Sequence, residues 1–447
     1  MNVFGIVTVR VVDAQFDAIE DPSTAGVSGI QETRMNRLTP VAQPHATLRH
    51  PARTVLAAAL LLATVSGSAL AQERTLKIYG FGAKSGVVGI FGQQSEAAMQ
   101  AAAAMINKAG GVTLGDGTKA RLVIEYLDDR CNAEEGINAL RRIAAQNDAF
   151  VAIGPTCSNV AEPVFGILQK KAGDASDSGI QFPIYTDVAA KGGLASISAW
   201  SFRNVPSESN MYKAVFEWVK ATRPELKTFF GGVEKDFAHS NATFGVIKTH
   251  AANHGLEVKG QAEWLLNDTN FSNQVREMRR AGADVVAISA HPFTSCGVLK
   301  EMARQNVKPK LIIGLTSSSS METLQGCGQQ AEGVIIPTSF APVTEEARRA
   351  AAAVQAINPK YNVDLHSAAA FENVFTIKEL VEKLKITARP DTIQADRQKM
   401  REGLAAMTQT TGLLGPVGRT PDREAIKPFL FVQAKAGAWQ VAHRPAQ

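Results

Sequence analysis

The sequence lacks the features that mark nucleic-acid-binding proteins and most enzymes. Lysine and arginine (47) exceed aspartate and glutamate (42) by only five charges, and no basic run with interleaved aromatics occurs. This balance supports neither binding to nucleic acid nor a polybasic membrane-binding patch. A G-x-S-x-G nucleophile motif is also missing, and no Ser/His/Asp set can be singled out. With 45% hydrophobic and 20% charged residues, the composition is that of a soluble globular protein with no sign of an enzyme.

Cofactor and metal motifs are incomplete. The Gly80-Phe81-Gly82 loop is similar to a dinucleotide fingerprint, but Gly86 lies one residue too far along and no acidic residue follows at the expected distance. His250 and His254 lie four residues apart, but the glutamate of a zincin motif is absent between them. We therefore predict no cofactor and no metal ion, with both histidines on the surface.

An export signal is present near the start of the chain. Basic residues precede a short apolar run at 55–63, and Ala69-Leu70-Ala71 then gives the small-x-small pattern that signal peptidase accepts. The run is far shorter than the roughly 20 residues needed to span a bilayer, and no cysteine follows it as a lipid-anchor site. Residues 35–71 are therefore predicted to be a signal peptide, with cleavage after Ala71 and release into the periplasm. Residues 1–34 are acidic, unlike a leader, and are interpreted as an upstream start-site extension.

Only four cysteines occur, and all follow the predicted cleavage site. In an oxidising compartment an even number favours two disulfides. Their order along the chain favours the local pairs Cys131–Cys157 and Cys296–Cys327. The alternative is a four-thiolate metal site, which would normally contain a C-x2-C element that this chain lacks.

Strands and helices alternate from residue 74, and the alternation restarts after Pro206. This order predicts an α/β fold with mostly parallel sheets and helices on both faces. Four serines, Ser317 to Ser320, follow an expected strand; they indicate a polar loop, or a ligand-binding loop at the carboxyl end of a sheet. The expected strands lie at 76–81, 120–127, 150–153, 227–231, 283–289, 311–313, 428–432 and 439–441, and the expected helices at 94–108, 134–147, 211–222, 243–254, 272–281, 296–305, 347–357 and 366–384.

Six short segments occur in an order that is typical of one protein family. Each segment alone is weak evidence for that family, but all six in this order behind an export signal are specific to it. On them the chain, from about Thr75 to Trp439, resembles the leucine/isoleucine/valine-type solute-binding proteins of bacterial ABC importers. The segments are I-N-K-A-G-G-V at 106–112, Y-L-D-D-R-C at 126–131, I-G-P-T-C-S at 153–158, D-T-N-F-S at 268–272, A-G-A-D at 281–284 and A-E-G at 331–333.

The resemblance implies a type I periplasmic binding fold with two Rossmann-like lobes, joined by three crossover segments, that close on a solute. Lobe I is expected at 74–205 plus 340–415 and lobe II at 206–339 plus 416–447. It also implies a disulfide between Cys131 and Cys157, a monomer, and an ABC permease as the partner that recognises the closed form. A ligand sensor of the same fold is the first alternative, and a secreted enzyme is the second.

The resemblance also carries binding roles onto individual residues. Ser158 holds the family's position for binding a ligand carboxylate, and Phe91 and Phe237 fall where aromatic side chains contact the ligand. The family's Ala-Thr pair falls on Val188 and Ala189, so the hydroxyl is absent and only backbone N–H groups could serve there.

The second lobe departs further from the family pattern. A position that is often tyrosine falls near His291, and the acidic residue that pairs with a ligand ammonium falls near Thr316, followed by Ser317. A buried ammonium without a carboxylate partner is costly. The resemblance therefore implies a small carboxylate or a polar neutral solute rather than a free amino acid, with an aromatic acid able to stack on Phe91 and Phe237.

Overall fold

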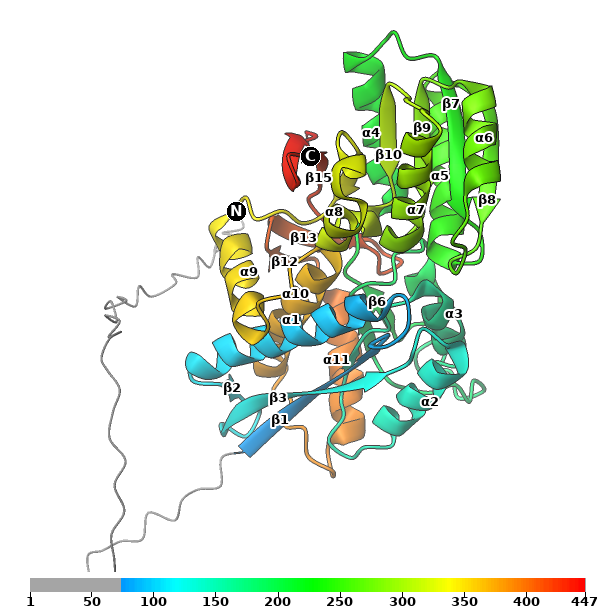
Figure 1. Ribbon diagram of the computed structural model, residues 1–447. Helices are drawn as coiled ribbons and strands as arrows, with labels where there is room; N and C mark the ends of the chain where they lie inside the picture. Colours follow the sequence, from blue (N-terminus) through cyan, green and yellow to red (C-terminus); the bar gives the residue numbers. More distant parts are fainter. Residues whose placement is uncertain (1–73, 447) are drawn as a thin grey trace, which may run out of the picture. The chain divides into compact units, whose positions relative to one another are not determined.

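The computed structural model describes residues 74–446, so the predicted extension at 1–34 and signal peptide at 35–71 lie outside the described residues. The described chain forms two lobes, each built on one mostly parallel sheet with helices on both faces (Figure 1). This confirms the predicted fold class. Among the described residues, no helix is both long and apolar enough to cross a membrane.

Lobe I contains the six-stranded sheet. All its strands are parallel except the short β2, which is antiparallel to β3. In sheet order these are β2 (Val112–Thr113), β3 (Lys119–Asp128), β1 (Arg74–Gly82), β4 (Ala152–Ile153), β5 (Ile184–Thr186) and β6 (Ser201–Arg203). Its helices are α1 (Gly89–Lys108), α2 (Ala133–Ala144), α3 (Ser158–Gly166), α9 (Glu345–Ile357), α10 (Leu365–Lys383) and α11 (Ile393–Ala406).

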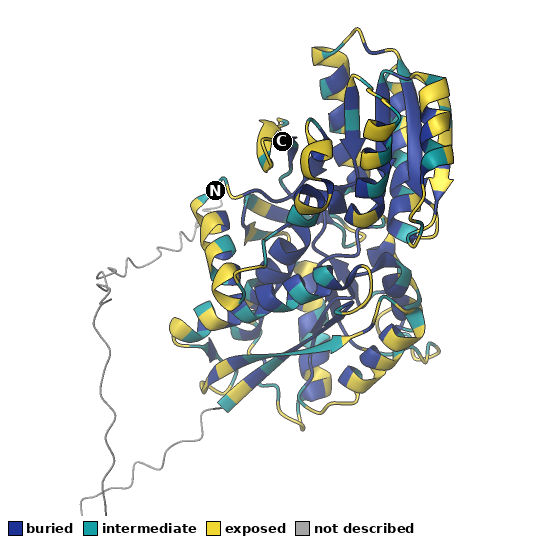
Figure 2. Ribbon diagram, in the orientation of Figure 1, coloured by how far each residue is buried: buried dark blue, intermediate teal, exposed yellow. Residues whose placement is uncertain are grey.

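Two hydrophobic cores cover the two faces of this sheet. Helix α1 packs with α9 and α10 on one side, and α2 packs with α3 on the other. The alanine-rich α1 is buried along most of its length, because its small side chains let α10 approach closely. Figure 2 shows the consequence: the inner strands of the sheet are mostly buried and β3 is half-buried, whereas the outer helix faces are exposed.

Lobe II contains the seven-stranded sheet, in which five parallel strands are extended by an antiparallel pair from the end of the chain. In sheet order these are β16 (Ala438–His443), β15 (Leu430–Lys435), β11 (Ile335–Thr338), β10 (Leu311–Gly314), β9 (Val285–Ser289), β7 (Thr228–Glu234) and β8 (Glu257–Trp264). The helices are α4 (Glu208–Thr222), α5 (Ala238–Asn253), α6 (Ser272–Ala281), α7 (Pro292–Arg304) and α8 (Met321–Cys327).

The chain passes between the lobes three times, after β6, after β11 and after a small third sheet. The small sheet comprises β12 (Gln409–Gly412), β13 (Gly415–Arg419) and β14 (Ala425–Ile426), and a buried Arg203–Glu424 ion pair ties it to β6. The three crossovers agree with the prediction, while the lobe boundaries at individual residues stay a prediction.

The structure differs from the expected elements in informative places. The serine run is not a solvated loop: Thr316–Ser319 forms a buried 3-10 turn, in which the Ser318 and Ser319 hydroxyls donate to Ala290 and Thr338 inside lobe II. The edge strand β8 was missed because its solvent side is polar. Helices α5 and α7 begin several residues earlier than predicted, so Phe237 and His291 become their capping residues.

Both expected disulfides are present. Cys131–Cys157, with an S–S distance of 2.10 Å, joins the loop after β3 to the start of α3. Cys296–Cys327, at 1.99 Å, joins α7 to the end of α8. The pairing leaves no free thiol among the described residues.

Candidate solute-binding site

The carboxyl ends of the parallel strands of both lobes meet at one small cavity. In parallel α/β sheets this edge is where ligands bind. Six of the eight predicted ligand-binding residues line the cavity, namely Phe91, Ser158, Val188, Phe237, His291 and Ser317; they are joined by Val88, Thr156, Cys157, Ala190, His239 and His366. The free volume is about 20 Å³, room for a single water molecule. A solute therefore needs the lobes or the lining side chains to move before it can enter.

Two predicted residues are placed elsewhere. Ala189 is buried in the lobe I core and its neighbour Ala190 lines the cavity instead. Thr316 is buried, and its hydroxyl donates to the carboxylate of Glu208 rather than facing the cavity.

Ser158 is the first residue of α3 and follows the disulfide cysteine Cys157. Its hydroxyl oxygen accepts a hydrogen bond from the backbone N–H of Lys191 at 3.2 Å. The free backbone N–H groups at the start of a helix favour an anion. Ser158 and the start of α3 thus form a wall of the cavity that favours an anion.

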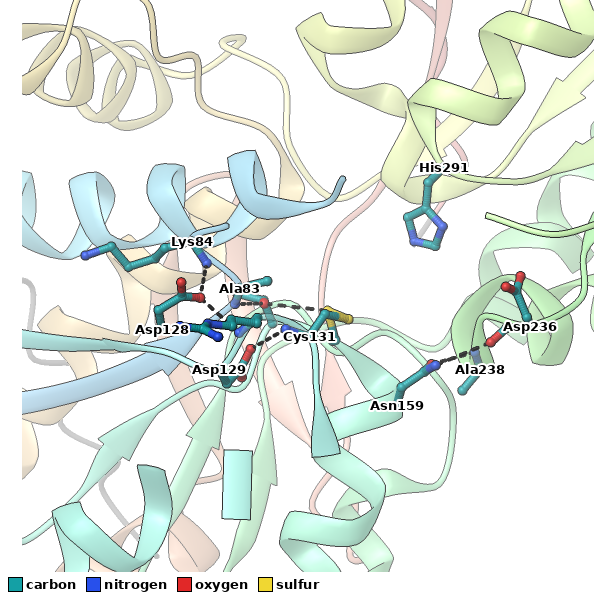
Figure 3. The surroundings of a disulfide bond; sticks show 12 residues. Ala83, Lys84, Asp128, Asp129, Cys131, Asn159, Asp236, Ala238 and His291 are labelled. Atoms are coloured by element: carbon teal, nitrogen blue, oxygen red, sulfur yellow. Dashed lines mark hydrogen bonds between the residues drawn. A yellow bond between two sulfur atoms is a disulfide. The ribbon is translucent and has the colours of Figure 1, made fainter. Parts of the chain in front are cut away.

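The next residue, Asn159, links the two lobes. Its side-chain oxygen accepts a hydrogen bond from the backbone N–H of Ala238 at 2.7 Å, and its amide group donates to the carbonyl of Asp236 at 3.4 Å (Figure 3). A second bridge runs from the Gln94 amide on α1 to the Glu322 carboxylate on α8, at 2.7 Å. These contacts hold the lobes together over the cavity.

A buried histidine–glutamate pair lies behind one wall. His239 Nε2 is 2.8 Å from Glu208 Oε1, and the hydroxyls of Thr243 and Thr316 also donate to this carboxylate. Burial raises the pKa of Glu208, but the charge of His239 and these hydrogen bonds outweigh it, so the pKa lies below its usual value. Glu208 is therefore ionised.

A second pair repeats this arrangement at the start of α7. His291 Nδ1 is 2.6 Å from Glu234 Oε1, and the Thr294 hydroxyl donates to Oε2 at 2.5 Å. Burial raises the pKa of Glu234, but the charge and hydrogen bond of His291, followed by Thr294, bring it below its usual value. The His291 ring lies 4.2 Å from the Phe237 ring, and Figure 3 shows it directed toward lobe I.

His366 completes the cavity from the first turn of α10. Its ring meets Phe91 edge-on, at 5.3 Å between centroids. Burial, followed by the charges of His239 and His291, lowers the pKa of His366 to about 3, so this imidazole is neutral near neutral pH.

Two polar atoms on the cavity wall have no hydrogen-bond partner among the described residues: His366 Nδ1 and Ser317 Oγ. Leaving a buried polar atom unpaired costs about 1–3 kcal/mol. Such atoms in a ligand cavity are where a solute can supply the missing partner. No group of three or more His, Cys, Asp or Glu side chains in the described range is placed to hold a metal ion.

His239, His366 and Asn159 were not predicted as site residues. The sequence predicts His366 at the start of a helix. Asp364, two positions earlier, is the residue that caps this helix. That pattern signals a helix start, but it does not show that two other histidines from lobe II approach it. Asn159 stands beside Ser158, yet its role depends on how the lobes close.

Comparisons with known proteins agree with this geometry. A family model described as periplasmic binding protein matches residues 75–438. The "Leu/Ile/Val-binding protein homolog 3" of Brucella melitensis is 24% identical over 311 residues, which cover 68% of this chain and 78% of that protein.

Two solved structures illustrate the likeness in fold. The branched-chain amino acid transporter substrate-binding protein LivJ of Streptococcus pneumoniae, in complex with isoleucine, aligns with a TM-score of 0.69 at 16% identity, covering 83% of this chain and all of that one. An ABC transporter solute-binding protein of Rhodopseudomonas palustris, in complex with benzoate, aligns with a TM-score of 0.68 at 15% identity, covering 83% and 96%. By the match of the family model to most of its length, this chain belongs to the periplasmic binding protein family.

Proposed function

We propose that this protein is the periplasmic solute-binding component of an ABC importer and captures a small carboxylate or polar neutral solute. The observation that carries the proposal is the cavity between the lobes, which Ser158 lines from the start of α3 and to which His366 and Ser317 each bring a buried atom without a hydrogen-bond partner among the described residues (His366 Nδ1 and Ser317 Oγ). A carboxylate can bind at the start of α3 and satisfy both atoms through its own or attached polar groups.

The charge arrangement favours an acid without an ammonium group. Glu208 and Glu234 are already bonded to His239 and His291. Burial raises the pKa of Asp187, which precedes the lining residue Val188, to about 7 and so disfavours its charged form. An ammonium would face these imidazoles instead of a free carboxylate. The benzoate bound by the Rhodopseudomonas palustris protein has this chemistry, whereas the isoleucine bound by the Streptococcus pneumoniae protein carries an ammonium.

Delivery of the solute would follow from closure. The bonds of Asn159 and Gln94 between the lobes support a hinge motion that traps the solute and presents a closed monomer to the permease. Cleavage after Ala71 would place the mature chain in the periplasm, and N-terminal sequencing of exported protein should then begin at Gln72.

Calorimetry on the mature protein tests the solute class. Ser158→Ala removes a hydrogen bond to a charged group, worth roughly 1.5–3 kcal/mol, so affinity for the bound acid should fall about ten- to a hundredfold. Ser196→Ala, which changes an exposed serine of the same lobe, is the control and should leave affinity unchanged. Tight leucine binding that Ser158→Ala does not affect would contradict the proposed solute class.

A further inference from the structure

A second and much larger pocket adjoins the candidate cavity. Its volume is about 490 Å³, and it shares Val88, Phe91 and His291 with the inner cavity. Small-molecule sites in proteins usually measure roughly 300–1,000 Å³. The inner cavity is far below that range, whereas the outer pocket lies within it.

The outer pocket is lined mainly by apolar side chains from both lobes. Ile90 comes from α1 in lobe I, and Phe271 and Pro292 come from the starts of α6 and α7 in lobe II. Because the walls come from two lobes, a molecule held here would be enclosed by the same closure that covers the inner cavity.

Two large apolar side chains that line this pocket are exposed to solvent. Val87, in the loop before α1, is 48% exposed, and Phe293, in the first turn of α7, is 52% exposed. Scattered exposed apolar residues are ordinary on a protein surface. Here, however, one from each lobe lines the same pocket, so that an apolar group between them would remove both from water.

Charge within the outer pocket is balanced. Lys300 and Glu322 lie on its wall, and Glu322 already accepts a hydrogen bond from Gln94. One charge of each sign favours neither an anion nor a cation. The part of a ligand that occupies this pocket is therefore best uncharged.

From these observations we infer that the solute is amphipathic, with its carboxylate or polar head in the inner cavity and an uncharged apolar chain or ring extending past Phe91 into the outer pocket. This inference rests on the proposed function, because it deepens the choice of solute at the same site. The head is held by polar groups near Ser158 and His366, and the apolar part lies between Val87 and Phe293.

Benzoate and 4-butylbenzoate form a matched pair of probes, since they share a head and differ in an apolar tail. In calorimetry with the mature protein, 4-butylbenzoate should bind at least tenfold more tightly than benzoate. Phe293→Ser should remove most of that gain while leaving benzoate affinity unchanged. Ile357→Ser is the control, because Ile357 is also exposed, at 42%, but lies at the end of α9 and not at the pocket.

The outcomes separate this inference from the proposed function. If benzoate binds and the butyl tail adds nothing, the inference is overturned while carboxylate binding stands. If neither acid binds, both are overturned. If Phe293→Ser impairs uptake in cells but leaves both affinities unchanged, this face contacts the permease instead, and the inference is again overturned.

Discussion

The side-chain oxygen of Asn159 accepts a hydrogen bond from the backbone N–H of Ala238 at 2.7 Å, and this contact joins lobe I to lobe II beside the solute cavity. Ala238 is the first residue of α5, so Asn159 satisfies one of the backbone donors that every helix start leaves free. The residue that follows Ser158 therefore acts as a cap for a helix of the other lobe.

Asn159→Ala should weaken closure without unfolding either lobe. A neutral hydrogen bond contributes about 0.5–1.5 kcal/mol, so affinity for a bound acid should fall roughly two- to tenfold. Solution scattering should show a larger open fraction. Asn132→Ala is the matched control, because Asn132 caps α2 within lobe I; it should lower thermal stability but leave affinity and scattering unchanged.

His366→Leu should lower the affinity for solute without lowering the stability of the protein. The substitution removes a buried atom that has no partner among the described residues, so unfolding free energy at pH 7 should stay unchanged or rise by about 1–3 kcal/mol. Solute affinity should fall, because the solute loses a partner. Denaturant unfolding and calorimetry measure the two quantities.

His254→Leu provides the comparison for His366→Leu. His254 is partly buried in lobe II and its Nδ1 is bonded to the carbonyl of His250. This variant should lose stability and keep affinity. If His366→Leu behaves in the same way, His366 has a structural role and the binding role is wrong.

Asp187, which precedes the cavity residue Val188, should make the stability of the protein depend on pH. Burial raises the pKa of Asp187 to about 7, and neither carboxylate oxygen has a hydrogen-bond partner among the described residues. The folded state therefore binds the proton more tightly than the unfolded chain, whose aspartate pKa is about 3.9. The contribution of Asp187 to the free energy of unfolding is therefore largest below about pH 3.9. It falls as the pH rises toward 7, by up to about 4 kcal/mol.

Asp187→Asn tests this sign, because an amide mimics the protonated carboxyl. Relative to wild type, the variant should gain stability above pH 7, and the difference should shrink as pH falls toward 4. Urea unfolding at several pH values measures it. A variant that is less stable than wild type at pH 8 would show that the ionised carboxylate has a partner in solution.

Removing the Cys131–Cys157 disulfide should lower stability and disturb the site. The bridge spans 26 residues, and closing such a loop is worth roughly 3–4 kcal/mol in the chain-entropy model. The double Cys→Ser variant should therefore unfold at lower denaturant concentration and also bind solute less tightly, because Cys157 precedes Ser158. Cys296→Ser with Cys327→Ser, a bridge spanning 31 residues, should cost similar stability; equal losses of affinity in both variants would contradict a specific effect at Ser158.

Local sequence signals predicted much of the fold, and the family resemblance predicted several residues that line the candidate cavity. Ser158 follows a strand and a disulfide cysteine within one short segment, so its place could be read from neighbouring residues. Glu208 and Glu234 could not, since each pairs with a histidine that is 31 or 57 residues distant in sequence. The position of Thr316 could not be predicted for the same reason. Its hydroxyl donates to Glu208, which is distant in sequence, and no pattern near the serine run indicates this contact.

The last two strands, β15 and β16, complete lobe II only after the chain has returned from lobe I, and β15 pairs with β11 about one hundred residues upstream (Ile335 with Gln433). Lobe I in turn needs α9 and α10, which follow β11. Each lobe is therefore incomplete until the chain has crossed to the other lobe and returned. A chain truncated before residue 430 would therefore leave the edge of β11 unpaired and open to association with other strands.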